Sequence, residues 1–247
     1  MSDSADWIYG IHAVGSAIKE NAGRVRVVYL QRGRRDGRLR ELRDMAQAAG
    51  VRTDMVDRRR LDQLCDGAHQ GVVAQCHGLA LANEADLEAA LAHLKLPRLL
   101  LLLDGVTDPR NLGACLRSAA AAGVQAVLLP KRRSAPLSAV ALKTAAGGAE
   151  SLLLVQVTNV ARRLKWLQEQ GLWVVGGSAS GERPWREADL TGDVVLVVGS
   201  EDKGLRPLTA KCCDELVHIP MQGAVASLNV SVATGILLFE AVRQRAA

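Results

Sequence analysis

The sequence predicts an α/β protein whose larger part is a parallel sheet covered by helices on both faces. Its 247 residues are 49% hydrophobic and 23% charged, which is enough for a sizeable core in one large or two modest domains. In the second half of the chain, short apolar runs alternate with helical patterns. These runs are almost continuous in Leu and Val, as expected for strands that are buried on both faces.

The first part of the chain, from Trp7 to about Cys76, is predicted to be a small α/β unit of its own. Its expected elements are helices Ile11–Lys19, Leu39–Ala49 (closed by Gly50) and Arg59–Cys65, and strands 25–30, 51–56 and 71–76. The polar, Ala- and Glu-rich stretch that follows suits a connector with some helix. The expected domains are therefore residues 1–76 and 98–247, joined by residues 77–97.

The strands of the second domain direct attention to the residues that follow them. The expected strands are 99–103, 124–129, 152–155, 172–175, 194–198 and 216–219. In open parallel sheets, ligands bind beyond the carboxyl ends of the strands. Three segments in such positions stand out: "DGVTDPRN" from Asp104, "GSEDKG" from Gly199 and "IPMQGAVASLNVSVATG" from Ile219.

The first segment opens a helix that carries two polar candidates. Asp108 is expected to cap this helix, with Pro109 as its first residue. Asn111 and Arg117 are six residues apart, so they do not share a helical face, yet both could reach a ligand lying across the start of the helix. The alternative is a capped turn with a solvent-exposed Arg117.

The other two segments add acidic and polar side chains at the same edge of the sheet. Gly199 and Gly204 have the spacing of a phosphate loop, but the Lys-Ser/Thr pair is missing and Glu201 would repel a triphosphate. Two glycines on either side of acidic residues instead suit a positively charged ligand, because glycine lets the protein backbone come close to it. In "SLNVS", Ser227 could cap a helix, whereas Asn229 in a first helical turn lowers helix propensity.

A basic tract in the first domain indicates nucleic acid as a partner. Residues 24–43 hold eight arginines against two acids, a net charge of +6 that exceeds the +5 of the whole chain. Arginine favours bidentate phosphate contacts and stacking on bases. The candidate RNA contacts are Arg32, Arg34, Arg35 and Arg38. The alternative is a solvated basic face.

Several classes of protein are disfavoured by composition. The longest strongly apolar stretch, residues 99–103, is far shorter than the ~20 residues of a membrane helix, and the first twenty residues lack a signal pattern. Five cysteines without a CxxC pair indicate reduced thiols, and scattered histidines offer no metal-ligand spacing. We expect a cytoplasmic protein that uses neither a membrane nor a metal.

The motifs resemble a known family. "DGVTDPRNLGACLRSA", "VVGSEDKGL" and "IPMQGAVASLNVSVATGILLFEAVRQR" resemble the three motifs of the SpoU branch of the SPOUT methyltransferases, and "WIYGIHAVGSAI" resembles the opening of its two-domain rRNA members. The resemblance covers nearly the whole chain, in order and with matching spacing. It implies an N-terminal L30e-like RNA-binding domain, a catalytic domain with a deep trefoil knot, S-adenosylmethionine as cofactor and a homodimer formed through the catalytic domain.

The resemblance also implies roles for individual residues. The cofactor would be lined, largely by backbone groups, by Gly199, Gly204, Ile219, Met221 and Leu228, and the catalytic positions would be Asn111, Arg117, Glu201, Ser227 and Asn229. The family uses the arginine to activate a ribose 2'-hydroxyl. Because a guanidinium stays protonated, we expect Arg117 to stabilise the developing alkoxide, with Glu201 orienting it.

The implied activity is S-adenosylmethionine-dependent 2'-O-methylation of a ribose, of a guanosine in 23S rRNA. One alternative is the same chemistry on tRNA, which an assay of total rRNA and tRNA with labelled cofactor would separate. The other is a non-catalytic RNA-binding assembly factor, for which decayed motif residues are expected.

Overall fold

The contacts within the chain divide it into two units. The computed structural model describes residues 6–34, 36–65, 67–79 and 81–246. One unit holds the described residues before Leu81 together with Leu137–Ser151, and the other holds Leu81–Pro136 and the residues from Leu152 onward. Domain boundaries after residues 76 and 97, expected from composition, stay a prediction.

The small unit is built on a four-stranded sheet in the order β1-β4-β2-β3. β2 pairs with β3 in parallel, and β4 pairs antiparallel with both β1 and β2. Its core is formed by apolar side chains of the sheet and of the helices packed on it, such as Val28 of β2, Val14 of α1 and Leu42 of α2. Its elements are β1 (Asp6–Tyr9), α1 (Ile11–Asn21), η1 (Ala22–Arg24), β2 (Val25–Gln31), α2 (Gly37–Ala48), β3 (Arg52–Val56), α3 (Arg58–Leu64), β4 (Val72–Cys76), α6 (Ala139–Ala145) and η2 (Gly148–Ser151).

The three helices and three strands expected from the sequence before residue 77 are present in this unit, and two of the differences have a clear physical reason. α2 begins at Gly37, two residues before the expected start, because the side chain of Asp36 accepts a hydrogen bond from the Arg38 backbone and caps the helix there. The strand β1 was not expected. Four residues are too short to show a periodic pattern, and β1 is held by its pairing with β4.

The large unit confirms the predicted parallel sheet. Its strands follow the order β7-β6-β5-β10-β8-β11-β9, and every pair is parallel. Its elements are α4 (Glu84–Leu91), β5 (Leu99–Asp104), α5 (Pro109–Ala121), β6 (Ala126–Pro130), β7 (Leu153–Val157), α7 (Val160–Glu169), β8 (Trp173–Gly177), β9 (Arg183–Pro184), η3 (Trp185–Glu187), β10 (Val194–Gly199), α8 (Pro207–Lys211), β11 (Glu215–His218) and α9 (Val230–Arg245). The two-residue β9 was not expected from the sequence.

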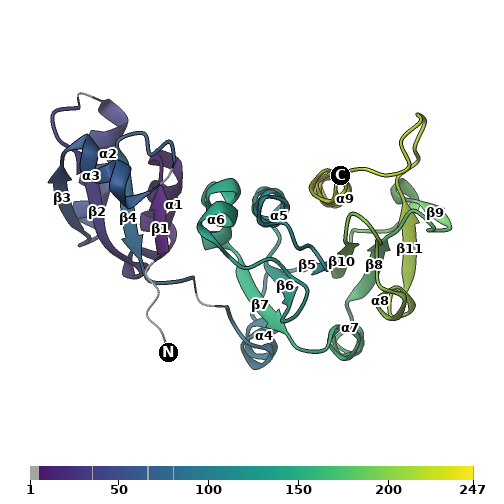
Figure 1. The fold of residues 1–247 in the computed structure, drawn as a ribbon. Coiled ribbons are helices and arrows are strands. Elements are labelled where there is room, and N and C mark those ends of the chain that lie inside the picture. The colour runs from purple at the N-terminus through teal and green to yellow at the C-terminus, as the bar shows by residue number, and fades with distance from the viewer. Residues whose placement is uncertain (1–5, 35, 66, 80, 247) are drawn as a thin grey trace. The chain divides into compact units, whose positions relative to one another are not determined.

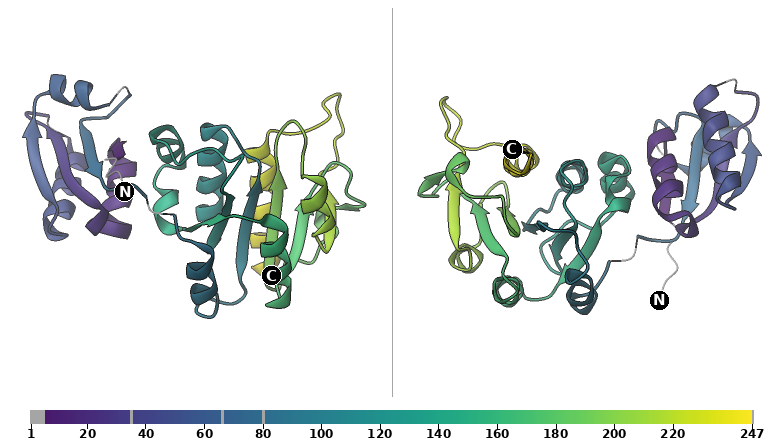
Figure 2. Two further views of the ribbon diagram at one scale, coloured as in Figure 1. Left: turned by 60° about the horizontal axis from the view of Figure 1, so that its bottom comes forward. Right: turned by 180° about the vertical axis from the view of Figure 1, so that it is seen from behind.

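Helices cover both faces of this sheet (Figure 1), which explains the sequence of its central strands. α5 and α9 lie on one face and α4, α7 and α8 on the other, and the reverse view in Figure 2 shows the same two layers. All five leucines of Leu99–Leu103 are therefore buried, although consecutive side chains of a strand point to opposite faces. Within the described residues, no helix is long and apolar enough to cross a membrane.

The caps of α5 and α9 place the first and third motifs. Asp108 caps α5 as expected, accepting hydrogen bonds from the backbone of Arg110 (2.6 Å) and Asn111 (3.4 Å), with Pro109 as the first helical residue. α9 differs from the expectation. Its cap is Asn229, whose side chain accepts from the Ser231 backbone at 2.9 Å. Ser227 therefore lies two residues before the cap, and the position of Asn229 outside the first turn removes its propensity cost.

Candidate active site

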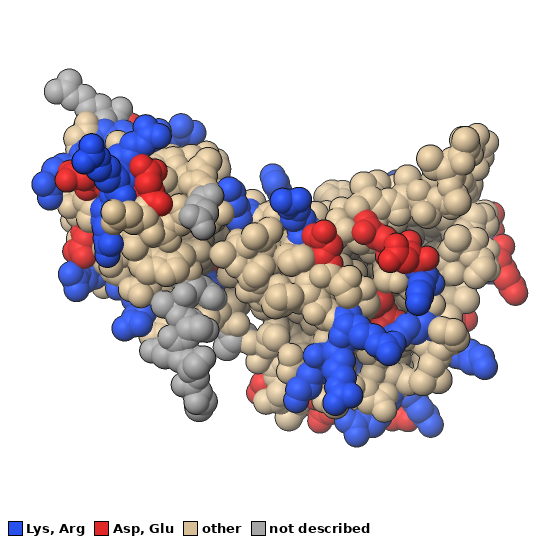
Figure 3. All heavy atoms as spheres, in the orientation of Figure 1, with Lys and Arg blue, Asp and Glu red and all other residues tan. Residues whose placement is uncertain are grey.

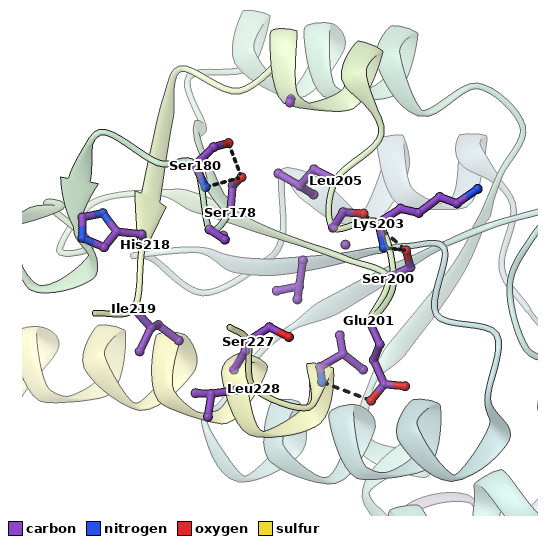
Figure 4. A pocket seen from close by; sticks show the side chains of 18 of the residues that line it. Ser178, Ser180, Ser200, Glu201, Lys203, Leu205, His218, Ile219, Ser227 and Leu228 are labelled. Carbon is purple, nitrogen blue, oxygen red and sulfur yellow. Dashed lines mark hydrogen bonds between the residues drawn. The ribbon is translucent and has the colours of Figure 1, made fainter. Parts of the chain in front are cut away.

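A cavity of about 810 Å³ opens beside the carboxyl ends of β8, β10 and β11 and the start of α9. Figure 4 shows its walls, with Leu205 across the cavity from Ile219 and Leu228, and with Glu201 reaching the first residue of α9. All five residues expected to line a cofactor are in its wall: Gly199, Gly204, Ile219, Met221 and Leu228. Of the five expected catalytic residues, Glu201 and Ser227 line it as well.

The turn after β10 requires glycine at both of its ends. The backbones of Ser200 and Gly204 exchange two hydrogen bonds, of 3.0 and 2.9 Å. A Cβ on Gly199 would lie 2.1 Å from the carbonyl carbon of Gly204, and Gly204 has a positive φ of 61°. This close approach excludes side chains and leaves backbone groups facing the cavity.

An ion pair between a buried carboxylate and a partly exposed arginine fixes the other end of this turn to the first motif. The Asp104 carboxylate at the end of β5 is fully buried, and it accepts hydrogen bonds from the backbone nitrogen (3.3 Å) and Nε (2.7 Å) of Arg206. The guanidinium Nη2 also contacts this carboxylate. Because a buried carboxylate without a partner is costly, the pair holds the segment from Gly199 to Arg206 against β5.

Three polar side chains from the three motifs meet at the start of α9. Asn229 Nδ2 donates to Asn111 Oδ1 on α5 at 3.1 Å, and it also donates to Glu201 Oε1. Glu201 Oε1 accepts a further bond from the Val230 backbone at 3.4 Å. Residues 28 and 118 positions apart in the sequence are thus joined in one hydrogen-bonded cluster beside the cavity.

Arg117 stands apart from this cluster. Its side chain is exposed on α5, and the part of the chain that the structure describes offers it no hydrogen bond or ion pair. The expected contact with Glu201 is therefore not made within the described chain, because the Glu201 carboxylate is directed to Asn229 and Val230. Arg117 keeps all five of its N–H donors available for a ligand.

The thiols beside the cavity are poor nucleophiles. Burial raises the pKa of Cys115 on α5 to about 11; a hydrogen bond to Thr234 acts against this rise, and the charge of Glu201 adds to it. Burial likewise raises the pKa of Cys213 to about 12. Both thiols are protonated near neutral pH, which disfavours thiolate chemistry at this site. The described residues contain no group of three or more His, Cys, Asp or Glu side chains that could hold a metal ion.

One wall of the cavity is formed by residues that were not predicted from the sequence. Ser178 and Ser180, which follow β8, and His218 at the end of β11 also line the cavity. The hydroxyls of the two serines lie 2.9 Å apart, and His218 Nδ1 lies 2.9 Å from the Gly181 carbonyl oxygen. The position of this loop at the carboxyl end of a predicted strand was a signal that could have identified it.

The basic tract of the small unit is partly neutralised by its own acids. Arg34 forms an ion pair with Asp36 at 3.3 Å, Arg38 approaches the same carboxylate at 3.6 Å, and Arg32 donates to the Met55 carbonyl at 3.1 Å. Arg35 lies outside the described residues. Lys and Arg side chains nevertheless predominate over the visible face around α2 and β3 in Figure 3.

The large unit has a parallel sheet with a cavity and a polar cluster at the carboxyl ends of its strands. These features define a class of ligand-binding α/β proteins, in which the loops after the strands carry the functional residues.

Two family models match the chain. One, described as the SpoU rRNA Methylase family, matches residues 98–239, and the other, described as RNA 2'-O ribose methyltransferase substrate binding, matches residues 7–82. The chain belongs to the SpoU rRNA methylase family.

Known proteins resemble the chain over almost its full length. It is 50% identical over 242 residues to the 23S rRNA (guanosine-2'-O-)-methyltransferase RlmB of Escherichia coli strain K12, covering 98% of this chain and 99% of that protein. A solved RNA 2'-O ribose methyltransferase is 28% identical with a TM-score of 0.81, covering 99% of this chain and 90% of that one. The SpoU methyltransferase AviRb of Streptomyces viridochromogenes, solved with AdoMet, shares the fold at 24% identity and a TM-score of 0.80, covering 97% and 90%.

Proposed function

We propose that the protein is an S-adenosylmethionine-dependent RNA methyltransferase that methylates the ribose 2'-hydroxyl of a guanosine in 23S rRNA. The observation that carries this proposal is the meeting of the three SpoU motifs beside one cavity, where Asn111, Glu201 and Asn229 form a hydrogen-bonded cluster and Glu201 lines the cavity. The 50% identity to a curated enzyme of this activity, over 98% of the chain, supports the choice of substrate.

The cavity fits S-adenosylmethionine. Gly199 and Gly204 present backbone groups without side-chain obstruction, Ile219 and Leu228 offer apolar surface for a planar base, and Glu201 places negative charge near the rim. When bound, this cofactor supplies a methyl group that is already activated on a sulfonium. Gly199, Gly204, Ile219, Met221 and Leu228 are the residues that we propose to hold it.

The polar residues act on the ribose. Asn111 orients it, because its Oδ1 is fixed by Asn229 while its Nδ2 donors stay available for a hydroxyl group. Asn229 acts through Asn111, since its own amide is fully used by Asn111, Glu201 and Ser231. Arg117, which is free of partners within the described chain, donates to the 2'-oxygen and stabilises the alkoxide that develops as the proton leaves to water or a phosphate. Glu201 positions Asn229 rather than Arg117, and Ser227 braces the loop before α9.

Two further elements of the proposal concern partners. The arginines of the small unit, Arg32, Arg34, Arg35 and Arg38, contact RNA phosphates, which agrees with the substrate-binding model matched over residues 7–82.

The large unit, which carries the catalytic residues, forms a homodimer. Val232 and Phe239 support this, since both are about half exposed on α9 and are spaced seven residues apart, two turns along one face.

The proposal is tested by incubating the protein with labelled S-adenosylmethionine and, separately, 23S rRNA and total tRNA. We expect label in 23S rRNA and in the ribose of a guanosine, under conditions found in the cytoplasm. Label in tRNA alone would instead establish a tRNA ribose 2'-O-methyltransferase. Binding of RNA without transfer of label would establish a non-catalytic assembly factor.

A further inference from the structure

The loop after β6 carries three consecutive cations and is fixed at both ends. The backbone nitrogen of Lys131 donates to the Val157 carbonyl at 2.8 Å, and the nitrogen of Ala135 donates to the Val106 carbonyl at 2.8 Å. Val106 belongs to the segment between β5 and α5 that also holds Asp108, the cap of α5. The loop is therefore attached directly to the first motif, at the same edge of the sheet as the candidate active site.

The three cations of this loop are not neutralised. Lys131, Arg132 and Arg133 are all exposed, and over the described ranges none of their side chains has a hydrogen bond or an ion pair. Arg34 and Arg38 of the small unit differ in this respect, since both share the Asp36 carboxylate. Lys131, Arg132 and Arg133 thus form an exposed, unpaired basic run in the large unit, attached to the first motif.

The backbone of the loop adds an independent observation. Arg133 has a φ of +61°, a conformation that L side chains rarely adopt and that glycine adopts freely. The exposed side chain of Arg133 gains no partner in the described chain from this conformation. Residues in this conformation are enriched at ligand-binding sites, so the backbone of Arg133 supports, beside its exposed and unpaired side chain, a ligand for the guanidinium.

We propose that Lys131, Arg132 and Arg133 form a phosphate-binding loop that holds the RNA backbone next to the ribose being methylated. The chemistry of RNA requires such a site, because every internal 2'-hydroxyl is adjacent to the 3'-phosphate of its own nucleotide. A site that receives this hydroxyl must also accommodate that anion. Arginine binds phosphate in a bidentate manner, and three clustered cations attract an RNA strand without reading its bases. This inference rests on the proposed function.

The test compares the full-length protein with the variant Lys131→Gln/Arg132→Gln/Arg133→Gln. The probe is unmodified 23S rRNA transcript, and the readouts are equilibrium RNA binding at several salt concentrations, the KM for RNA and the affinity for S-adenosylmethionine. If all three side chains contact phosphates of unpaired RNA, the slope of log K against log salt falls by about 2, at roughly 0.7 per phosphate. We expect the KM for RNA to rise at least about tenfold, and cofactor affinity to stay unchanged.

Two further variants keep the result interpretable. Lys95→Gln/Lys165→Gln/Lys211→Gln removes the same charge from exposed positions of the same unit, and it should change the salt slope much less. Arg133→Gly removes one contact and relaxes the backbone, so it should lower the slope by about 0.7 without loss of thermal stability. Equal slopes and KM values for the loop variant and the lysine control would overturn the proposal. Because RNA binding is measured without methyl transfer, an inactive wild-type protein would count against the proposed function alone.

Discussion

Asn229 and Asn111, which are 118 positions apart in the sequence, are joined by a hydrogen bond of 3.1 Å between their side chains. Asn229 does this while its own Oδ1 caps α9 by accepting from the Ser231 backbone. One side chain therefore caps the N-terminus of α9, links α9 to α5 and contacts Glu201. Its structural and functional contributions can be separated by substitution.

The variant Asn229→Asp is expected to keep the helix cap and lose activity. Aspartate caps helices as well as asparagine does, but its carboxylate cannot donate to Asn111 and would repel Glu201. Methyl transfer should fall on the order of 10²-fold from the misplaced cluster. Unfolding in urea should show a smaller loss of stability than Asn229→Ala, which also removes the cap at a cost of about 1 kcal/mol. Wild-type turnover in Asn229→Asp would show that the cluster is not needed.

Arg206→Ala is expected to weaken both stability and cofactor binding. The substitution leaves the buried Asp104 carboxylate without its charged partner. Because the Arg206 side chain is 39% exposed, we expect a cost below the roughly 3–5 kcal/mol of a fully buried pair. The turn from Gly199 to Arg206 also loses its attachment to β5, so the KM for S-adenosylmethionine should rise. Chemical denaturation and cofactor titration measure the two effects. In the double variant Asp104→Asn/Arg206→Ala the stability losses should be less than additive; full additivity would argue against a direct pair.

Glu84 should make stability depend on pH in the acid range. Burial alone would raise its pKa, but hydrogen bonds and charge from Arg163, with a hydrogen bond from the Thr158 backbone, outweigh this and lower the pKa to about 2. Because the folded pKa lies below the ordinary value of 4.5, the contribution is complete above about pH 4.5 and is lost as the pH falls toward 2. At pH 7 the free energy of unfolding of Glu84→Gln should be lower than that of wild type by on the order of 3 kcal/mol.

The same comparison at low pH provides the check. The difference between wild type and Glu84→Gln should shrink steadily from pH 5 to pH 2.5, as the wild-type carboxylate becomes protonated. A difference that stays constant over this range would mean that Glu84 contributes through packing and not through its charge. Arg163 is also paired with Glu88 at 2.9 Å, so the fold is expected to survive the substitution.

The parallel sheet and the positions of its loops could be predicted from the sequence because both follow from local rules. Continuous apolar runs such as Leu99–Leu103 indicate strands buried on both faces, and an Asp before Pro109 indicates a helix start. The pairing of Glu201 with Asn229, in contrast, depends on where two loops meet in space. Short edge elements such as β9 are also invisible in the sequence, because two residues carry no periodicity.

The role of Arg117 in the chemical step predicts a separation of binding and turnover. Arg117→Ala should lower methyl transfer by about 10²- to 10³-fold, as expected when a donor to a developing anion is removed. Affinity for S-adenosylmethionine should stay within about twofold, because Arg117 does not line the cavity. Cofactor titration and single-turnover kinetics measure these quantities. Parallel losses in binding and turnover would show that Arg117 supports the cofactor site and does not act on the hydroxyl.

The most direct test of the proposed activity is mass spectrometry of nucleosides from unmodified 23S rRNA incubated with the purified protein and S-adenosylmethionine carrying a deuterated methyl group. The proposed function predicts one new nucleoside, guanosine with the labelled methyl group on its 2'-oxygen, and its formation by Arg117→Ala at a rate lower by about 10²- to 10³-fold. A labelled methyl group on a base, or on the ribose of tRNA but not of 23S rRNA, would contradict it.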